Sequence, residues 1–504
     1  MADTRARHVI IFGIDGLRPD MVRNATMPNL SALKRRGAWS QDHRTVFPSE
    51  TRGALTALAT GSAPATNGVL GNQFYPRSDT LRQVFTNTIE DWHAADRTLE
   101  GGMVTAVGLS EVLARNGRSF AVVTSSGQGS LSALNWHGEV YGQTGFNVRH
   151  PQIGFPHRLA ADIHRLHGVP PCGFEKGNEK KVVEIATTSV WAQARPDVMV
   201  LWLTEVDSAS HRFGLGSAEH LEALERSDAA LGQLVDWRDT LKERDDVVIL
   251  VTSDHGHVTA SELVCLTEIL KGAGFSAADS FESDADILVR PGRAIGFWLR
   301  HQDPVLLQAI QAFISEQSWY GGSFSPAPDQ DAHLGTVEGT LALHLIGADH
   351  DRAPDLFLNL KGADDVNQFG VVGSAAYDPG NYQTFVGAGT HGGLHRRELA
   401  AVLLGDGSAL GSGAIASRTN ITDIAPTVLA LLNLPAPSSM SGRVLTELLG
   451  GECSSKEPHL ASLELRSEGA IQTVLRLTRA YDRHYCDEGW AECAKAETGK
   501  DKAA

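Results

Sequence analysis

Five short apolar runs predict the strands of a buried β-sheet. They are His8–Ile14, Phe120–Thr124, Val198–Thr204, Val247–Ser253 and Leu399–Leu404. Each run is almost continuously apolar rather than alternating with polar residues, which is typical of parallel strands covered on both faces. Amphipathic stretches long enough for crossover helices separate the runs, for example Met27–Arg36, Val104–Asn116 and Ala218–Leu241. The pattern therefore predicts an α/β fold with helices on both faces of one sheet.

The amino-acid composition and the length of the candidate strands change after residue 273. From residue 274 to residue 382, Gly, Pro, Asp and Ser are more frequent, and the candidate strands are short. We expect this segment to form a smaller α+β insertion that caps the rest of the fold. The predicted domains are a core made of residues 1–273 and 383–450, the cap insertion 274–382, and a C-terminal helical extension and tail, 451–504.

The composition is that of an ordinary soluble protein. Of the 504 residues, 42% are hydrophobic and 21% are charged, and the formal net charge is −16. Without a run of Lys or Arg, such a charge argues against a nucleic-acid polymer or an anionic membrane as a partner. The apolar run Val9–Ile14 is too short for a signal peptide, and no stretch approaches the roughly 20 apolar residues of a membrane helix. We therefore expect a soluble, cytoplasmic protein, and the sequence does not indicate its oligomeric state.

Acidic residues follow three of the predicted strands. Asp15 comes directly after the first strand, Asp207 shortly after the third, and Asp254 with His255 directly after the fourth. In an open α/β sheet, ligands bind beyond the carboxyl ends of the strands. Three distant segments should therefore bring carboxylates to one edge of the sheet, where buried negative charge needs a cationic partner or a metal ion.

Two of these segments have the spacing of metal ligands. Asp207 and His211 are four positions apart, so a helix would place both side chains on one face. Asp254 and His255 are adjacent, and a turn after the strand would let both reach one ion. Each segment also has a structural interpretation. Asp207 could cap a helix with His211 on the surface, and the adjacent pair could form a hydrogen-bonded turn.

A third segment contains a candidate histidine ligand. Two glycines follow His391, which suggests that the backbone approaches a ligand closely there. His395 is a nearby competitor for the same role. A lone histidine is more often structural, so this interpretation depends on the other segments.

A candidate nucleophile opens a predicted helix. Thr51 begins a helical pattern that Gly61 ends. The Thr51 hydroxyl would therefore lie at the positive end of the helix dipole, where an alkoxide or a phosphate oxygen is stabilised. The alternative is a threonine that only caps the helix. A bound metal would favour the catalytic role, because it lowers the pKa of the hydroxyl.

In their chain order, these motifs resemble the alkaline phosphatase superfamily, and most closely its type I phosphodiesterase/nucleotide pyrophosphatase branch, which includes phosphonoacetate hydrolase. The resemblance covers the segments Arg7–Asn72, Arg195–His257 and Thr390–Leu445. The motifs that carry it are FGIDGLRPDM around Asp15, the helix from Thr51 to Gly61, Gly68–Asn72, Asp207–His211, Ser253–Gly256 and Thr390–Gly392.

The resemblance implies an alkaline-phosphatase-like core sheet and a site for two divalent metal ions. The residues implied for one ion are Asp207, His211 and His391. Those implied for the other are Asp15, Thr51, Asp254 and His255. Nitrogen and oxygen ligands without thiolate suit Zn²⁺, which this family usually binds, and they are compatible with Mn²⁺ or Fe.

The resemblance also implies roles toward the substrate. Thr51 would be the nucleophile that forms a phosphothreonine intermediate, and Asn72 would hold a phosphoryl oxygen. Many nucleotide pyrophosphatases have Phe-Pro-Asn after the nucleophile, whereas Arg52–Ala54 follow it here. The lysines of a phosphonoacetate pocket are missing between residues 125 and 142. His137 stands in that segment and is a predicted substrate-binding residue together with Asn72.

The predicted function is a metal-dependent hydrolase of small anionic phosphate esters, similar to phosphodiesterases and nucleotide pyrophosphatases. Two alternatives use the same metal core: a phosphonoacetate-type phosphonate hydrolase and a phosphomonoesterase. A third alternative, a metal-dependent binding protein without turnover, would require a blunted nucleophile, whereas Thr51 is intact.

Overall fold

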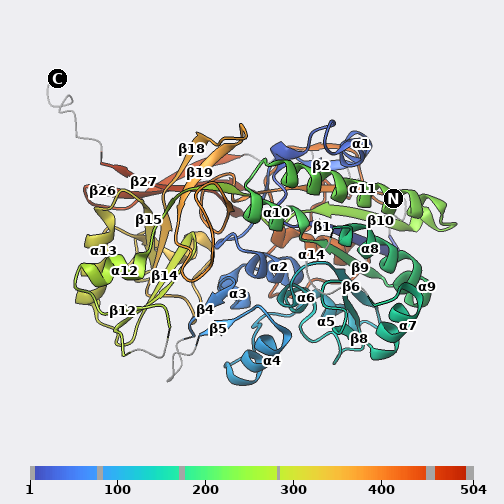
Figure 1. Cartoon of the computed structure of the whole chain (residues 1–504), viewed down its shortest axis with the longest axis horizontal. Helices are drawn as coiled ribbons and strands as arrows, with labels where there is room; N and C mark the ends of the chain where they lie inside the picture. Colours follow the sequence, from blue (N-terminus) through green and yellow to red (C-terminus); the bar gives the residue numbers. More distant parts are fainter. Residues whose placement is uncertain (1–5, 77–82, 170–175, 281–283, 450–459, 495–504) are drawn as a thin grey trace.

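A nine-stranded sheet forms the centre of the computed structural model, which describes residues 6–76, 83–169, 176–280, 284–449 and 460–494 (Figure 1). From one edge to the other the strands are β23 (Gly413–Ile415), β2 (Ala38–Ser40), β22 (Leu403–Asp406), β10 (Val247–Thr252), β1 (His8–Ile14), β9 (Val198–Leu203), β6 (Phe120–Thr124), β7 (Thr144–Asn147) and β8 (Gly154–Phe155). The consecutive strands β10, β1, β9, β6 and β7 are parallel. Four of the five predicted strands therefore lie side by side at the centre of one sheet.

The fifth predicted strand differs in its direction and its bounds. Strand β22 begins at Leu403 and runs antiparallel to β10. The preceding Ala400–Ala401 forms β21, which pairs with β3 (His43–Arg44) in a separate sheet. The prediction of one parallel strand over Leu399–Leu404 was wrong, because a short apolar run carries no information about strand direction.

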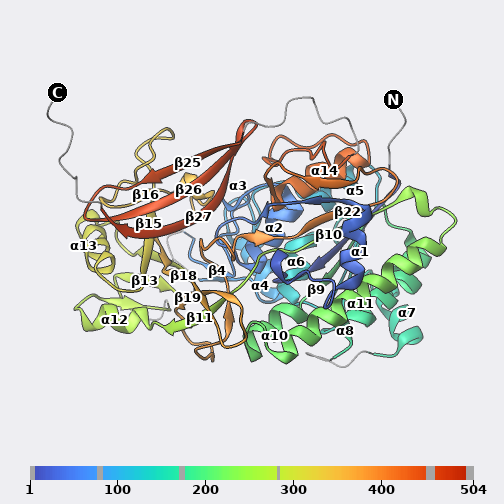
Figure 2. The same ribbon diagram turned by 90° about the horizontal axis from the view of Figure 1, so that it is seen from above.

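Helices cover both faces of the central sheet, as predicted (Figure 2). One face holds α2 (Thr51–Thr60), α5 (Leu109–Arg115), α6 (Gln128–Asn135) and α14 (Ile424–Leu431). The other holds α1 (Pro28–Arg36), α7 (His157–His167), α8 (Asn178–Ile185) and α11 (Ala218–Thr240). In β1, Val9 and Ile11 pack on the first face, whereas Ile10 and Phe12 pack on the second. No helix within the described ranges is long and apolar enough to cross a membrane.

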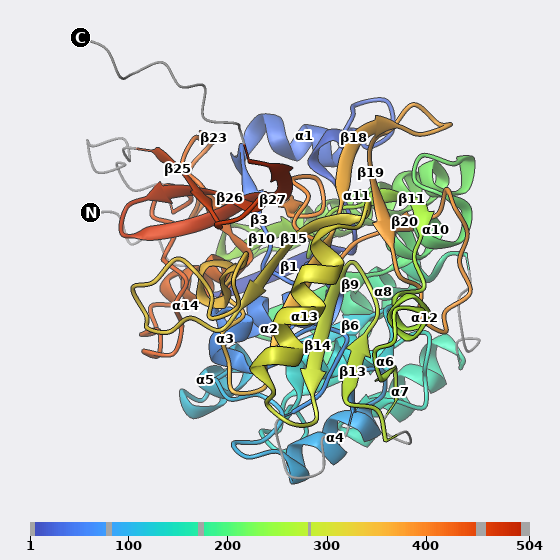
Figure 3. The ribbon, with the colours of Figure 1, turned by 90° about the vertical axis from the view of Figure 1, so that its left-hand side faces the viewer.

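The predicted insertion contains a six-stranded sheet, on the left in Figure 1. Its strands are, in order, β12 (Ala277–Ala278), β13 (Ile287–Arg290), β14 (Ala294–Leu299), β17 (Leu356–Leu360), β15 (Tyr320–Ser325) and β16 (Leu341–Ala342). Helix α13 (Pro304–Ser315) packs on one face, in front of the sheet in Figure 3. Helix α12 (Leu266–Gly272) packs in the same apolar cluster, so the predicted boundary after residue 273 does not match the packing.

The second face of the insertion sheet packs against the core. Trp298, Phe324 and Phe357 belong to the same apolar cluster as Leu55 and Leu58 of α2. Phe47, four residues before Thr51, lies with its ring centroid 5.4 Å from that of Phe357. The insertion is therefore joined to the core through a shared hydrophobic interior.

The prediction of a helical C-terminal extension was wrong. Residues 461–493 form a three-stranded antiparallel sheet of β25 (Ala461–Arg466), β26 (Ile471–Ala480) and β27 (Arg483–Cys493). The two-residue turn Tyr481-Asp482 joins the two long strands, with Tyr481 at φ 58°. Thr473 anchors the sheet to the insertion, because its hydroxyl accepts a hydrogen bond from the Ser323 backbone at 3.0 Å. The predicted tail, Lys495–Ala504, lies outside the described residues.

Candidate active site

Three parallel strands deliver aspartates to one edge of the central sheet. Asp15 directly follows β1, Asp254 follows β10 after one residue, and Asp207 lies in α10 (Glu205–Phe213), the helix that follows β9. Because these strands pair in register, their carboxyl ends meet at the same edge. The convergence predicted from the sequence is confirmed in this geometry.

Asp207 is the centre of a group of histidines. Its Oδ1 lies 3.1 Å from His211 Nε2, 3.2 Å from His257 Nε2 and 3.6 Å from His391 Nε2. One ligand atom from each of the four residues lies within 4.8 Å of the others. His395, the competitor of His391, faces away toward Asp364 at 3.6 Å. His257 was not among the predicted ligands, although it stands two positions after His255.

A second group surrounds His255. Its Nε2 lies 3.5 Å from Asp15 Oδ1 and 3.3 Å from Asp254 Oδ2. The other oxygen of Asp254 accepts hydrogen bonds from the backbone N–H groups of Gly16 and His255, both at 3.0 Å. These bonds fix the Asp254 carboxylate with one oxygen turned toward the histidine.

Thr51 lies beside the second group. It is the first residue of α2, and Glu50 occupies the N-cap position, so Thr51 does not act as a helix cap. The buried Thr51 Oγ1 is 3.3 Å from His255 Nε2. Glu50 is engaged elsewhere, because it forms an ion pair with Arg290 and accepts a hydrogen bond from the Asn72 backbone at 2.6 Å. The hydroxyl therefore faces the cluster at the positive end of the helix.

Backbone carbonyls orient the two predicted histidine ligands near Asp207. His211 Nδ1 lies 2.7 Å from the Gly389 carbonyl oxygen, and His391 Nδ1 lies 2.9 Å from that of Ser49. A carbonyl only accepts, so each Nδ1 carries a proton, and in the neutral ring the lone pair lies on Nε2. The two Nε2 atoms are 3.1 Å apart. Two lone pairs at this distance repel each other unless a cation lies between them.

Two of the three carboxylates, those of Asp15 and Asp254, lack compensating protein charge. Burial raises the pKa of Asp15 well above its ordinary value, and the neighbouring Asp254 and Asp207 raise it further. Burial also raises the pKa of Asp254 to about 7. For Asp207 burial acts in the same direction, but His211 and His257 outweigh it and hold the pKa well below the ordinary value.

The residues present fit a pair of divalent cations. One buried oxygen of each of the three clustered aspartates has no hydrogen-bond partner among the described residues: Asp15 Oδ1, Asp207 Oδ1 and Asp254 Oδ2. Two divalent ions against three aspartates would give a formal charge of about +1, which attracts an anionic substrate. Oxygen and imidazole nitrogen ligands are compatible with Zn²⁺, Mn²⁺ or Fe.

A cavity of about 340 Å³ opens beside the cluster. His211, His391 and Asn72 line one part of it, and Tyr377 and Tyr382 line another. The Asn72 side-chain oxygen accepts a hydrogen bond from the N–H of Arg52, the residue after Thr51, at 3.2 Å. The Asn72 amide N–H₂ can therefore donate to a ligand oxygen, and the structure brings Asn72 to the site as predicted.

The sequence model of type I phosphodiesterases/nucleotide pyrophosphatases matches residues 9–333, more than half of the chain. The chain belongs to this family. The resemblance to this branch of the alkaline phosphatase superfamily is thereby confirmed.

Individual relatives in the family are distant. Venom phosphodiesterase 2 of Crotalus adamanteus is 25% identical over 260 residues, which are 49% of this chain and 26% of that protein. Ectonucleotide pyrophosphatase/phosphodiesterase family member 7 of Mus musculus is 23% identical over 280 residues, 55% of this chain and 56% of that protein. The chain thus matches about a quarter of the length of the venom relative.

A solved structure confirms the α/β fold class. Murine ectonucleotide pyrophosphatase/phosphodiesterase 5, in an inactive variant with alanine in place of a threonine and in complex with AMP, superposes with a TM-score of 0.60. The identity is 15%, and the match covers 88% of this chain and 99% of that chain.

His137, predicted to bind substrate together with Asn72, does not line the cavity that Asn72 lines. It follows the C-terminal end of α6, and its Nε2 pairs with Asp96 Oδ2 at 2.9 Å. The N-terminal end of α6 is the end near the site, since a Cβ on Gly127 would lie 3.0 Å from the Arg52 guanidinium. The eight residues of α6 extend about 12 Å, which carries His137 away from Thr51.

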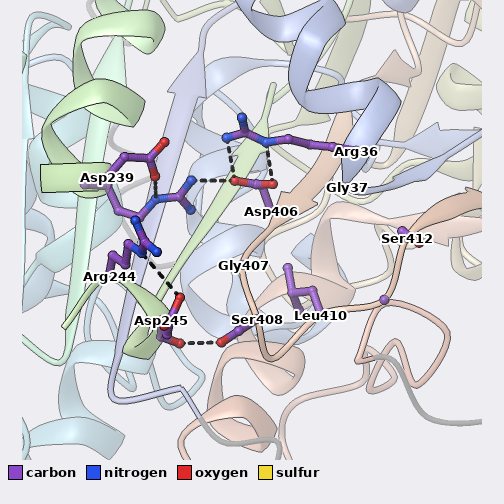
Figure 4. Close-up of a pocket in the computed structure, with 12 residues that line it drawn as sticks. Arg36, Gly37, Asp239, Arg244, Asp245, Asp406, Gly407, Ser408, Leu410 and Ser412 are labelled. Carbon is purple, nitrogen blue, oxygen red and sulfur yellow. Dashed lines mark hydrogen bonds and ion pairs between the residues drawn. The ribbon is translucent and has the colours of Figure 1, made fainter. Parts of the chain in front are cut away.

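A larger cavity, about 560 Å³ (Figure 4), lies near the amino end of β10, at the other end of this strand from Asp254. Asp406 in this cavity pairs in register with Ile249, near the start of β10. Asp254 lies five residues further along, about 16 Å at the usual strand rise. Arg36 and Arg238 both bind the Asp406 carboxylate, at 2.9 Å and 2.8 Å. The charges in this cavity therefore compensate one another, unlike those around Asp15.

Proposed function

We propose that the chain is a metal-dependent hydrolase of phosphate esters, similar in activity to phosphodiesterases and nucleotide pyrophosphatases, with Thr51 as its nucleophile. The observation that carries the proposal is the position of the Thr51 hydroxyl, at the start of α2 and 3.3 Å from His255 Nε2. A hydroxyl that faces a set of metal ligands from a helix N-terminus has the environment that activates a nucleophile. Family membership supports the same activity.

The proposed ligands divide into two sets. Asp207, His211 and His391 would hold one ion. Asp15, Asp254 and His255 would hold the other together with the Thr51 hydroxyl. We propose Zn²⁺ for both positions, because the donors are nitrogen and oxygen without thiolate, and Mn²⁺ or Fe would also fit. Bound there, the ions would lower the pKa of the Thr51 hydroxyl and offset the charge of the phosphoryl oxygens.

The chain's own residues would guide two displacements at phosphorus. The Thr51 hydroxyl loses its proton, and Oγ1 forms a bond to phosphorus as the bond to the leaving oxygen breaks. The leaving oxygen takes up a proton, which gives the free alcohol and a phosphothreonine. Water then loses a proton and attacks the same phosphorus, the bond to Oγ1 breaks, and Thr51 regains its proton. The N-terminal end of α2 and the Asn72 amide would stabilise the negative charge that develops on the phosphoryl oxygens.

The adjoining cavity supports an ester with an organic group beside the phosphate. Its volume of about 340 Å³ and the rings of Tyr377 and Tyr382 would suit such a group. The murine neighbour is in complex with AMP, which makes a nucleotide a candidate for this chain as well. A small anionic phosphodiester or nucleotide is therefore the proposed substrate class, ahead of a phosphonate or a monoester.

Replacement of Thr51 tests the mechanism. We expect Thr51→Ala to lower kcat by about 10³-fold or more, as the loss of a catalytic nucleophile does. Thr56→Ala is the matched control, because Thr56 is buried in the same helix and its hydroxyl donates only to the Arg52 carbonyl, at 2.8 Å. Equal turnover in the two variants would remove Thr51 from the mechanism.

A substrate panel tests the reaction class. The zinc-loaded protein would be assayed with bis-p-nitrophenyl phosphate, a nucleotide p-nitrophenyl ester, p-nitrophenyl phosphate and phosphonoacetate. The two diesters should be turned over fastest. Faster turnover of phosphonoacetate or of the monoester would move the assignment to those classes, and turnover of none would favour a binding protein.

A further inference from the structure

His257 lies inside the cluster but belongs to neither of the ligand sets above. Its side chain is fully buried, and its Nε2 is 3.2 Å from Asp207 Oδ1. Its ring centroid lies 5.3 Å from that of His211 and 5.1 Å from that of His391. His257 therefore faces the same carboxylate oxygen as the two histidines assigned to the first ion.

The orientation of the His257 ring is that of a metal ligand. Its Nδ1 lies 3.1 Å from the Gly16 carbonyl oxygen, which can only accept, so Nδ1 carries the proton. Its Nε2, which carries the lone pair in the neutral ring, is buried and has no hydrogen-bond partner within the described part of the chain. Metal-ligating histidines almost always donate their other N–H to a carbonyl or a carboxylate. His211 and His391 are held in the same way.

The backbone opposite His257 leaves room for its ring. Gly16 has a φ of +72°, and a Cβ at that position would lie 2.3 Å from His257 Cε1. Any side chain at residue 16 would therefore displace the imidazole. The Gly16 N–H also donates to Asp254, so one glycine positions a residue of each group.

We propose that His257 is a fourth protein ligand of the ion held by Asp207, His211 and His391. The proposal rests on the metal-dependent function proposed above. Three imidazoles and one carboxylate fill a tetrahedral coordination shell, whereas three ligands leave a position open for water or substrate. The first ion would then have four protein ligands, as many as the second set has with the Thr51 hydroxyl.

Metal affinity tests the proposal without reference to turnover. Wild type, His257→Gln and His43→Gln would be loaded with zinc and dialysed against increasing concentrations of a competing chelator, with the zinc content per chain measured by mass spectrometry. His43 is a suitable control because it is buried, and its Nδ1 contacts Thr419 at 2.8 Å, away from the cluster. We expect His257→Gln to lose one of its two ions at a free chelator concentration at least about tenfold lower than wild type does. The chelator concentration that removes the other ion should be the same in both proteins.

The absorption spectrum of the cobalt-loaded protein gives a second readout. Loss of an imidazole ligand should alter the bands of one of the two cobalt ions in His257→Gln and leave His43→Gln like wild type. Wild-type affinity at both positions in His257→Gln would overturn the proposal. Equal weakening in the His257 and His43 variants would also overturn it, since it would indicate a general loss of packing. Failure of the wild type to bind any divalent ion would instead refute the proposed metal-dependent function.

Discussion

Acidic side chains gather at both edges of the central sheet, but only one edge supplies them with cations from the protein. Where β10 begins, Arg36 and Arg238 bind Asp406, and although burial raises its pKa, their hydrogen bonds bring it below the ordinary value. Where β1 and β10 end, burial and neighbouring carboxylates raise the pKa values of Asp15 and Asp254. Acidic residues alone therefore do not identify a site.

The difference lies in how the charge is compensated. An arginine fixes a carboxylate within the fold and contributes to stability. A carboxylate with buried, unpartnered oxygens costs free energy until a cation from solution binds it. Chemistry is expected at the edge where compensation must come from outside, and the following predictions test this contrast.

Metal removal should have the largest effect on turnover and on the free energy of unfolding, and it should act only through the cluster around Asp15 and Asp254. Treatment with a chelator should abolish turnover and lower the free energy of unfolding, by about 2.7 kcal/mol for each ion that was present at 100 times its dissociation constant. Thermal unfolding with and without chelator measures this loss. Asp406→Asn should show the same loss as wild type, because Arg36 and Arg238 already compensate the Asp406 carboxylate. Full activity in the metal-free protein would contradict the view that the carboxylates of Asp15 and Asp254 need cations from solution.

Replacement of Asp406 should affect stability and leave turnover unchanged. Asp406→Asn removes the charge that both Arg36 and Arg238 bind, so we expect the free energy of unfolding to fall by about 2 kcal/mol. Urea unfolding would measure the change. Asp239→Asn is the control: its side chain is 47% exposed and pairs with Arg238 alone, so its effect should stay below about 1 kcal/mol. A fall in kcat in Asp406→Asn would show that Asp406 also influences the candidate active site, contrary to this prediction.

A buried histidine outside the cluster should produce a smaller, pH-dependent effect. Burial lowers the pKa of His43 to about 3, with a contribution from Arg44. Its unfolded pKa is about 6.5, so the unfolded chain binds the proton first as the pH falls. The stability from the neutral ring is present above pH 6.5 and is lost by about 1.4 kcal/mol per pH unit below it.

Comparison of His43→Gln with wild type between pH 6 and pH 4.5 tests this sign. The free energy of unfolding should fall by about 2 kcal/mol less in the variant than in wild type over this range. His157→Gln, which changes an exposed histidine on α7, should fall in parallel with wild type. Parallel curves for all three proteins would show that the pKa of His43 is the same in the folded and the unfolded chain.

The sequence predicted the parts of the fold and the site that depend on local pattern. The strands that end at Asp15 and Asp254 are continuous apolar runs, so their burial and the position of their carboxylates follow from the pattern. The direction of β22 depends on long-range pairing, which a single segment does not encode. The C-terminal sheet pairs strands that are neighbours along the chain through short turns, so its strands were open to prediction from the sequence and were missed. The position of His137 could not be predicted, because proximity in sequence to a site segment does not fix which end of a helix faces the site.

His257 shows a different limit. His257 stands two positions after a predicted ligand pair, but its role depends on the space left by Gly16 and on the Gly16 carbonyl that accepts a hydrogen bond from its Nδ1. Both features come from a segment more than 200 residues away. Glycine followed by histidine just after a ligand pair was the available signal, and it gains meaning only when the opposite backbone is known.

The shared interior of the insertion and the core limits how the protein can be shortened. Phe47 packs on Phe357 just before Thr51, and Arg290 of the insertion pairs with Glu50. Residues 274–382 therefore help to hold the segment that carries Thr51 in place, and they are not a separate cap that could be removed. We expect that deleting them would not yield a minimal hydrolase, and that substrates enter through movements of side chains and loops without a swinging domain.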